Sequence, residues 1–193
     1  KIYMTDGRGK TTSYSYGAFG KLSRMVDAEN KEITYQYDLA GNLAAAVDRN
    51  GRTTLYAYDN RNLLLEKKAD TGEQINYAYD EAGNRTGMAD ESGSYTYSFD
   101  VNDRLMEIRK DGSLQTGYTY DELGNIASVT DSLGFATSYT YDKSSRMETV
   151  ACTGLTVAYA YDENGNRESV AYSSGIRETF RYDRDNHLLA LTN

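Results

Sequence analysis

A four-residue pattern, Tyr-x-Tyr-Asp, recurs along this chain at nearly constant spacing and constrains its fold more than any other feature. Full copies occupy residues 35–38, 56–59, 77–80, 118–121, 139–142 and 159–162, and degenerate copies occupy 14–17, 97–100 and 180–183. The fourth positions of the nine copies follow one another in steps of 20 or 21 residues. A fixed period of this length indicates a repeat architecture in which each unit packs on its neighbours. We therefore expect residues 1–193 to form a single array of about nine repeats.

The two tyrosines of each copy lie two residues apart, which is the period of a β-strand. This spacing places both rings on one face of a strand and the residue between them on the other. We expect the rings to form a structural aromatic ladder, each cross-strand pair adding about 0.5–1 kcal/mol. The predicted ladder residues are Tyr35, Tyr37, Tyr56, Tyr58, Tyr77, Tyr79, Tyr118, Tyr120, Tyr139, Tyr141, Tyr159 and Tyr161. Rings that face solvent would instead favour a platform on which sugars stack.

Each tyrosine pair is followed by Asp-x-x-Gly, or in alternate copies by Asp-x-x-Asn, Asp-x-x-Asp or Asp-x-x-Ser. Asp at the first position of a type I turn accepts a hydrogen bond from the backbone two residues on, and Gly or Asn tolerates the left-handed conformation that follows. We expect these residues to be structural turn formers. The predicted turn residues are Asp38, Gly41, Asp59, Asn62, Asp80, Gly83, Asp121, Gly124, Asp162 and Gly165.

A second set of turns lies half a repeat later. Four-residue turns are expected at 6–9, 27–30, 48–51, 90–93 and 131–134. The segments 70–72 and 111–112 look one residue tighter, and 151–154 and 172–175 look looser. No segment is predicted to be helical.

This turn rhythm, one turn every 10 or 11 residues, predicts an all-β chain of about 17 or 18 strands. The fold class is therefore an all-β, curved antiparallel sheet strip of consecutive β-hairpins, with about two strands per repeat. The alternative is a β-propeller, because two repeats have the size of one four-stranded blade. The continuous turn rhythm favours the strip.

Composition narrows the classes of partner. The net charge of −8 disfavours nucleic acid and anionic membranes, which attract clustered Lys and Arg. No apolar run approaches the roughly 20 residues of a membrane-spanning helix, so no membrane insertion is expected. The chain has no proline, which suits a backbone whose N–H groups serve sheet ladders. Its single cysteine, Cys152, cannot form an internal disulfide and leaves the redox compartment open.

No group of residues predicts catalysis or a cofactor. The repeated Asp residues could be metal ligands or catalytic carboxylates, but each occupies the turn position that Asp favours. Calcium binding at 183–186 or 48–51 would lack the spacing of known calcium loops. His187, the only histidine, fills a turn position, and Cys152 has no His partner in its repeat. We expect no enzyme, no catalytic residue, no metal site and no cofactor.

The repeated pattern Tyr-x-Tyr-Asp-x-x-Gly-Asn-Leu (or Asn-Arg-Leu), as at 35–43, and then Asp-x-x-Gly-x-x-Thr, as at 48–54, resembles the tyrosine–aspartate (YD) repeat of bacterial Rhs proteins. Similar repeats occur in insecticidal toxin complexes and in teneurins. The resemblance covers the whole chain. It implies a strip of hairpins that forms part of a hollow β-shell enclosing a C-terminal toxin or effector domain, or else a surface adhesion scaffold.

Two features of the family are absent from this sequence. Its Asp-Pro-x-Gly junction, which closes the shell, cannot occur in a chain without proline, and no toxin domain follows the repeats. We therefore expect an open segment of a YD shell, cut from a longer protein that is secreted or displayed on a bacterial cell surface.

The resemblance also implies the partners. They are the remaining repeats of the parent chain and an encapsulated toxin domain. In the alternative function, a carbohydrate- or receptor-binding adhesin module, the partner is a glycan or a cell-surface receptor. The unpaired edges of the end strands also predict edge-to-edge self-association.

Overall fold

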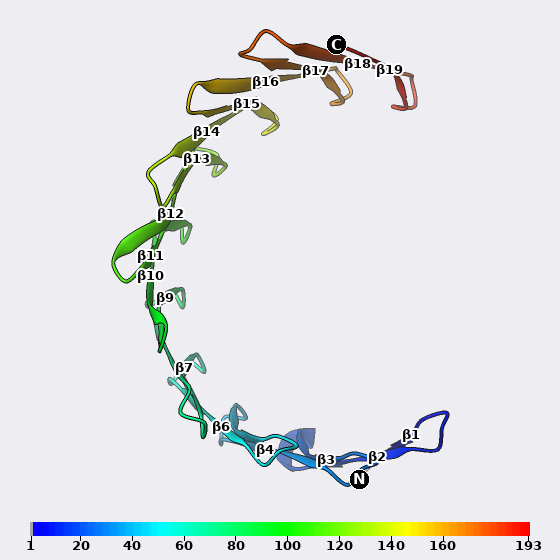
Figure 1. Cartoon of the computed structure of the whole chain (residues 1–193), viewed down its shortest axis with the longest axis vertical. Coiled ribbons are helices and arrows are strands. Elements are labelled where there is room, and N and C mark those ends of the chain that lie inside the picture. The colour runs from blue at the N-terminus through cyan, green and yellow to red at the C-terminus, as the bar shows by residue number, and fades with distance from the viewer. Residues whose placement is uncertain (1) are drawn as a thin grey trace. The chain divides into compact units, whose positions relative to one another are not determined.

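The computed structural model describes residues 2–193, which form 19 β-strands and one 3₁₀ turn (Figure 1). The chain divides inside β10 into two compact units, Lys1–Thr96 and Tyr97–Asn193. The strands are β1 (Ile2–Thr5), β2 (Thr11–Tyr16), β3 (Leu22–Val26), β4 (Glu32–Tyr37), β5 (Leu43–Val47), β6 (Thr53–Tyr58), β7 (Leu64–Ala69), β8 (Gln74–Tyr79), β9 (Arg85–Asp90), β10 (Gly93–Phe99), β11 (Leu105–Lys110), β12 (Ser113–Tyr120), β13 (Ile126–Asp131), β14 (Ala136–Tyr141), β15 (Met147–Cys152), β16 (Leu155–Tyr161), β17 (Arg167–Tyr172), β18 (Arg177–Tyr182) and β19 (Leu188–Thr192).

The 19 strands belong to one open antiparallel sheet, which confirms the predicted fold class. Within each unit every strand pairs with its neighbours in the sequence, from β1 with β2 to β9 with β10, and from β11 with β12 to β18 with β19. A propeller would interrupt this pairing after every four strands, and neither unit contains such an interruption. The expected 17 or 18 strands become 19 because β1 pairs with β2 ahead of the first tyrosine copy.

The single helical turn, η1 (Ala18–Gly20), departs from the expectation of no helix. It directly follows the first degenerate copy, in which Gly17 replaces the aspartate of the other copies. The amide of Lys21 donates to the carbonyl of Ala18 at 3.3 Å, which closes the turn without a carboxylate. Among residues 2–193, η1 is the one helix, and it is far too short to cross a membrane.

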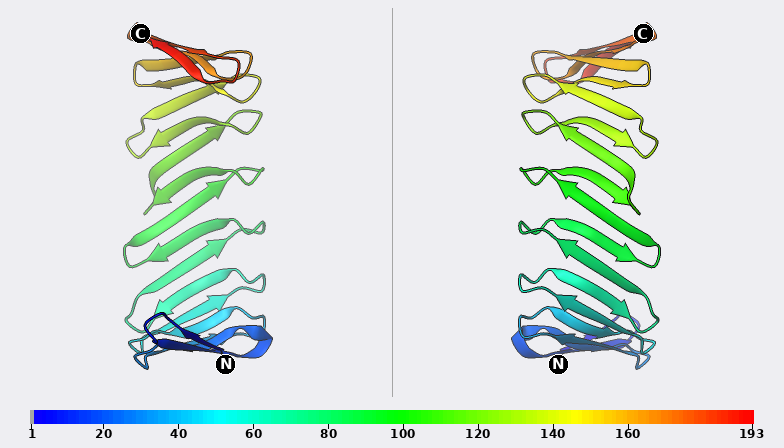
Figure 2. Two further views of the ribbon diagram at one scale, coloured as in Figure 1. Left: turned by 90° about the vertical axis from the view of Figure 1, so that its right-hand side faces the viewer. Right: turned by 90° about the vertical axis from the view of Figure 1, so that its left-hand side faces the viewer.

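A β-bulge recurs at the second tyrosine of each copy. Gln36 lies opposite Ala45 and Tyr37 lies opposite Leu43, so Ala44 is an extra residue on β5. Bulges increase the local twist of a strand pair and bend it. The same shift occurs at Tyr16, Tyr58, Tyr79, Tyr120, Tyr141, Tyr161 and Tyr182. One bulge per repeat explains why each unit is a curved strip (Figure 1), with its strands running across the width and turns along both edges (Figure 2).

The two faces of the sheet differ in side-chain size. On the tyrosine face the first tyrosine of a copy lies opposite an aliphatic residue in most repeats, as Tyr77 does with Met88 and Tyr139 with Val150. The opposite face carries mostly small or polar residues, such as Thr140 opposite Thr149. In the six full copies the residue between the two tyrosines is exposed, while both tyrosines are half-buried. The alternation agrees with a period of two residues.

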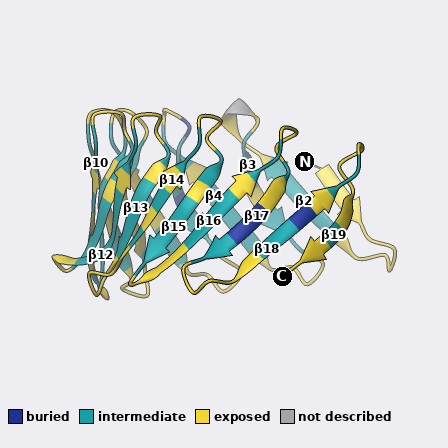
Figure 3. Cartoon of the chain, turned by 90° about the horizontal axis from the view of Figure 1, so that it is seen from above, coloured by how far each residue is buried: buried dark blue, intermediate teal, exposed yellow. Residues whose placement is uncertain are grey.

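Very few residues are buried, because the sheet is a single layer (Figure 3). Among residues 2–193 the buried apolar side chains are Ala45, Val170 and Phe180, with exposures of 9%, 4% and 8%. The twelve tyrosines of the full copies are all half-buried against their cross-strand neighbours. Packing along the sheet surface therefore takes the place of an interior core.

Candidate functional site

The turns that follow the tyrosine strands lie along one edge of the strip, which we call the YD edge. Consecutive antiparallel strands place alternate turns on opposite edges, so the second set of turns lies on the other edge, here called the far edge. At the YD edge the amide of Gly41 donates to the carbonyl of Asp38 at 3.0 Å, and the amide of Asp38 donates to the carbonyl of Asn42 at 2.9 Å. These two bonds close a four-residue β-turn whose fourth residue, Gly41, has positive φ.

The aspartate side chain closes this turn at two points. In the turn that starts at Asp59, the amides of Arg61 and Leu63 both donate to Asp59 Oδ1 at 2.9 Å. The amide at the fifth position donates to the same oxygen in the turns of Asp38, Asp80, Asp100, Asp121, Asp142, Asp162 and Asp183. Sequence reasoning predicted the bond two residues on and missed the second one.

Left-handed backbone marks the fourth position of these turns. The φ angles are +87° at Gly41, +95° at Gly83, +90° at Gly124, +87° at Gly165 and +66° at Asn62. The substitutes in the remaining copies, Asp103, Ser145 and Asn186, also have positive φ. Gly41, Asn62, Gly83, Gly124 and Gly165 thus lie at the fourth positions of turns that begin at Asp38, Asp59, Asp80, Asp121 and Asp162.

The second carboxylate oxygen of each aspartate contacts a side chain, most often that of the fifth residue. Asn42 donates its Nδ2 to Asp38 Oδ2 at 3.1 Å, and Arg104 donates its Nε to Asp100 Oδ2 at 2.7 Å. Asn84, Asn125, Arg146, Asn166 and His187 make the same contact. The sequence alternates Gly-Asn with Asp-Arg or Ser-Arg at the fourth and fifth turn positions. This alternation could have predicted the contact, which the sequence analysis did not include.

These bonds hold the pKa of the turn aspartates below the ordinary value. For Asp59 the largest cause is the hydrogen bond from the backbone of Leu63. For Asp121 and Asp162 it is the side-chain amide of Asn125 or Asn166, opposed in part by desolvation. A carboxyl whose pKa is lowered stays ionised at neutral pH and is a poor general acid. The electrostatics of these turns therefore favour a structural role.

In six copies the second tyrosine bonds back to the preceding repeat. Tyr141 donates its hydroxyl to the carbonyl of Ile126 at 3.0 Å, just beyond the last main-chain pair of β13 and β14, Ser128 with Ser138. Tyr37, Tyr79, Tyr120, Tyr161 and Tyr182 donate to the carbonyls of Leu22, Leu64, Leu105, Met147 and Arg167. The hydroxyl thus continues the ladder by one rung after the main-chain pairs end.

Side chains also join consecutive YD-edge turns within each unit. In the first unit Asn42 donates to Asn62 Oδ1 at 2.7 Å, and Lys21 Nζ donates to the carbonyl of Gly41. In the second unit Asn166 donates to Asn186 Oδ1 at 2.8 Å.

Cations stack on some of the rings. Arg104 lies 4.4 Å from the ring centre of Tyr120, and Arg146 lies 4.5 Å from that of Tyr161. Both arginines also pair with their turn aspartates at 2.7 Å. A YD-edge turn therefore contacts the tyrosine of the next repeat as well as its own backbone.

The far edge is irregular, and three of its turns differ from the sequence expectation. The segments 90–93 and 151–154, expected to be a four-residue and a looser turn, are two-residue hairpins, since Asp90 pairs with Gly93 and Cys152 with Leu155. The turn expected at 70–72 starts one residue earlier, with Gly72 donating to the carbonyl of Ala69. Asp70 is thereby released and accepts the amide of Thr53 at Oδ2, 2.7 Å away. Ser173 accepts the amide of Thr156 in the same manner at 3.0 Å.

The remaining far-edge turns have the predicted lengths. The loop of Asp111 and Gly112 joins Lys110 to Ser113 directly, as a tight hairpin. The turn at 172–175 closes with four residues, since Gly175 donates to the carbonyl of Tyr172.

The far edge accounts for the two step lengths of the repeat. The strand pairing across each far-edge loop has a constant register. The residue seven positions after one YD-edge aspartate lies opposite the residue four positions before the next YD-edge aspartate, as Ala45 does with Leu55 and Thr149 with Ala158. The two 20-residue steps contain the two-residue loops at 91–92 and 153–154. The third such loop, at 111–112, is offset by a bulge at Gln115, and its step remains 21.

The surface has shallow hollows. One, of about 400 Å³, lies beside Tyr35 over Ala46 and Thr54, with Asp48, Arg52 and Asp70 among its lining. It opens there because alanine occupies a position that holds Met88 or Val150 in other repeats. Cys152 is a half-buried free thiol in β15, and His187 is exposed.

Comparison with known proteins bears on the repeat itself. A sequence model of the family described as RHS Repeat matches residues 18–53, 37–74, 99–135 and 120–153, which together include more than half of the chain. No protein with a curated function matches the sequence.

Solved structures share the fold. The crystal structure of TcdB2-TccC3-Cdc42 aligns with a TM-score of 0.68 at 16% identity, covering 93% of this chain and 12% of that one. The structure of the Tc holotoxin pore of Photorhabdus luminescens aligns with a TM-score of 0.56 at 16% identity, covering 98% of this chain and 12% of that one. The chain therefore spans about an eighth of the solved chains that it resembles.

Proposed function

Because the chain belongs to the RHS repeat family, a family of structural repeats, we propose that it is a non-catalytic wall segment of a hollow β-shell. In this proposal the shell belongs to a longer, secreted or surface-displayed bacterial protein and encloses a C-terminal toxin or effector domain. The partners of the segment are the other repeats of its parent chain and the enclosed domain. The whole of residues 1–193 acts as one array.

The observation that carries the proposal is that the repeated polar side chains form hydrogen bonds with the backbone of the chain itself. Six tyrosine hydroxyls donate to carbonyls of the preceding repeat, and the turn carboxylates accept amides of their own turns. Groups committed to backbone partners are not free for a substrate. We therefore propose a structural role for the ten turn residues and for the second tyrosine of each full copy. We extend this role to the first tyrosines because their rings are half-buried.

The shape of each unit supports the same function. Each is a single-layer curved strip, and one bulge per repeat bends it at regular intervals. In a single layer few residues are buried, and most of the chain contributes to the two surfaces of the sheet. Such a layer is suited to form a wall around a volume. The solved Tc complexes share this fold.

Limited proteolysis of the longer protein tests the proposal. We expect its C-terminal domain to resist protease when the repeats are intact and to be cleaved when Tyr120 and Tyr141 are both changed to alanine. The matched control changes the exposed neighbours Thr119 and Thr140 to alanine, which leaves the tyrosine rungs in place. A C-terminal domain that is cleaved as fast in the intact protein as in isolation would overturn the proposal.

The adhesin alternative makes a different prediction. It requires binding of the chain to glycans, with loss of binding when Tyr35 is replaced beside its hollow. A glycan array probed with the isolated chain separates the two functions, and we expect no binding.

A further inference from the structure

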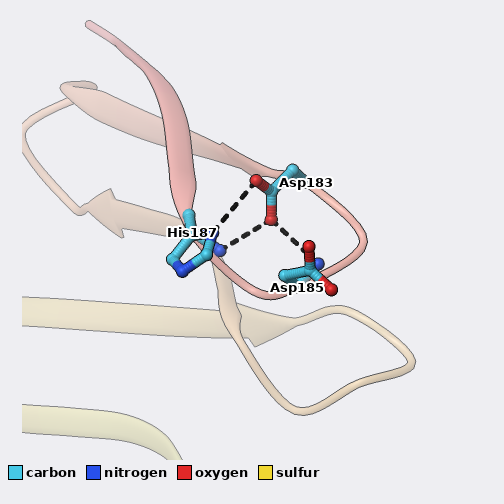
Figure 4. A group of neighbouring side chains, drawn as sticks. All are labelled: Asp183, Asp185 and His187. Carbon is cyan, nitrogen blue, oxygen red and sulfur yellow. Dashed lines mark hydrogen bonds and ion pairs between the residues drawn. The ribbon is translucent and has the colours of Figure 1, made fainter.

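The turn that starts at Asp183 differs chemically from every other YD-edge turn. It carries Asp at the first position, Asp at the third and His at the fifth (Figure 4). The neighbouring turn has Asp162, Asn164 and Asn166 at the same positions. His187 is the only histidine of the chain, so an imidazole next to two carboxylates occurs once.

The turn backbone brings these three side chains together. Asp183 Oδ1 accepts the amides of Asp185 and His187, both at 2.9 Å. One ligand atom from each of Asp183, Asp185 and His187 lies within 4.8 Å of those of the other two. The third and fifth residues therefore present their side chains beside the carboxylate of the first.

The spacing of two of these atoms fits a shared metal ion. Asp183 Oδ2 and His187 Nδ1 are 3.2 Å apart. Two neighbouring ligands that each lie about 2.0–2.2 Å from one ion in tetrahedral or octahedral geometry are separated by about 2.8–3.6 Å. The backbone amides of Asp185 and His187 occupy Oδ1 of Asp183. Among residues 2–193, Oδ2 contacts only the His187 ring, so an ion would bind between these two atoms in place of their hydrogen bond.

The turn is held in place before any ion arrives. The amide of Asn186 donates to the carbonyl of Asp183 at 3.1 Å, and the amide of Asp183 donates to the carbonyl of His187 at 2.9 Å. Asn166 of the neighbouring turn donates to Asn186 Oδ1 at 2.8 Å. A fixed backbone lowers the ordering cost of binding.

We propose that Asp183, Asp185 and His187 bind a divalent transition-metal ion such as Ni²⁺ or Zn²⁺, with water in the remaining coordination positions. The imidazole nitrogen favours these ions over Mg²⁺ and Ca²⁺, which prefer oxygen ligands. The site is exposed and uses three side chains of a single turn, so the ion exchanges with solvent. The site is independent of the shell function.

A structural reading of His187 makes the opposite prediction. Asn166 donates to Asp162 Oδ2 at 3.0 Å in the neighbouring turn, and the imidazole could serve Asp183 in that role alone. This equivalence supplies the test, because His187→Asn and Asp185→Asn each recreate a residue that the neighbouring turn already accommodates. Both variants are therefore expected to keep the fold.

The experiment is a titration of the tag-free chain with Ni²⁺ at pH 7.5, followed by calorimetry and by NMR of the imidazole resonances. We expect one ion per chain and selective broadening of the His187 signals, because Ni²⁺ is paramagnetic. Each variant should weaken binding by at least about tenfold, since a lost ligand costs no less than a lost outer-shell partner.

Mg²⁺ at the same concentration serves as the control and should leave the signals sharp. A dissociation constant of about 1 mM marks the weakest binding of interest. His187 resonances that stay unchanged at about 1 mM Ni²⁺ would therefore overturn the proposal. So would a His187→Asn variant that binds as tightly as the native chain. Urea midpoints of the two variants and the native chain should agree, which excludes unfolding as the cause of lost binding.

Discussion

The two edges of the strip are built from similar turns, yet they follow different rules. At the YD edge every turn from Asp38 onward has an aspartate at the first position and a residue with positive φ at the fourth. At the far edge the loops have two or four residues. Two of them also bond to the strand that follows the preceding far-edge turn: Asp70 accepts the amide of Thr53, and Ser173 accepts the amide of Thr156. One edge is constant and the other varies.

The difference shows where the register of the array is set. The pairing of the seventh residue after each aspartate with the fourth residue before the next is the same for both step lengths. A residue lost in a far-edge loop either shortens the step to 20 or is restored by a bulge at Gln115. The far edge therefore absorbs variation in length, and the YD edge keeps the strands aligned.

The largest expected effect compares the same glycine change at the two edges. Gly41 and Gly51 both have positive φ, +87° and +80°, so alanine at either should cost about 1–2 kcal/mol of unfolding free energy. At Gly41 the new Cβ would also lie 3.0 Å from Lys21 Nζ and displace it from the Gly41 carbonyl, at about 1 kcal/mol more. At Gly51 the new Cβ meets open space. Urea unfolding of the two variants measures the difference, and equal losses would contradict a special role for the YD edge.

A smaller effect compares the side chains that extend the ladder at each edge. Tyr120→Phe removes the 2.7 Å bond to the carbonyl of Leu105 and should cost about 1 kcal/mol. Ser173→Ala removes the bond from the amide of Thr156, which water replaces because Ser173 and Thr156 are exposed, so about 0.5 kcal/mol or less is expected. Hydrogen exchange of the neighbouring amides locates each loss. If Ser173→Ala accelerates exchange of its neighbouring amides more than Tyr120→Phe does, the far edge contributes more to stability than the YD edge.

The smallest expected effect concerns acid. The pKa of Asp59 is lowered in the folded chain, chiefly by the amide of Leu63, so its contribution to stability is fully present above the unfolded pKa of about 3.9. That contribution is lost as the pH falls through the lower folded value. Asp59→Asn should therefore reduce stability at pH 7 and flatten its decline below pH 4. Thermal unfolding of the variant and the native chain between pH 2.5 and pH 7 measures this, and parallel curves would show that the carboxylate charge contributes nothing.

Much of the fold could be predicted from the repeat. The two-residue spacing of Tyr35 and Tyr37 indicated a strand, and Asp38 with Gly41 indicated the turn that follows. These signals are local, because strand and turn preferences act within a few residues. The comparison with the RHS repeat family and the open antiparallel sheet confirm the identification of the repeat and its fold class.

The far edge was harder to predict, because its turns depend on partners distant in sequence. Asp70 looked like the start of a tight turn, yet it bonds to Thr53 across the sheet. The segment around Cys152 lacks an aspartate and looked loose, although Thr153 and Gly154 form a two-residue hairpin. The bonds from six second-position tyrosine hydroxyls to carbonyls 14 or 15 residues earlier were also missed, since they depend on where the main-chain ladder stops.

The constant register at the YD edge has a consequence for how such genes change length. Recombination between two copies of the repeat would remove or add complete hairpins. The strands on either side of the junction would still meet with the seventh residue opposite the fourth, because every copy restores that alignment by itself. An insertion of half a repeat would reverse the direction of every later strand. Whole repeats are therefore the units that can be gained or lost without disturbing the register of the sheet.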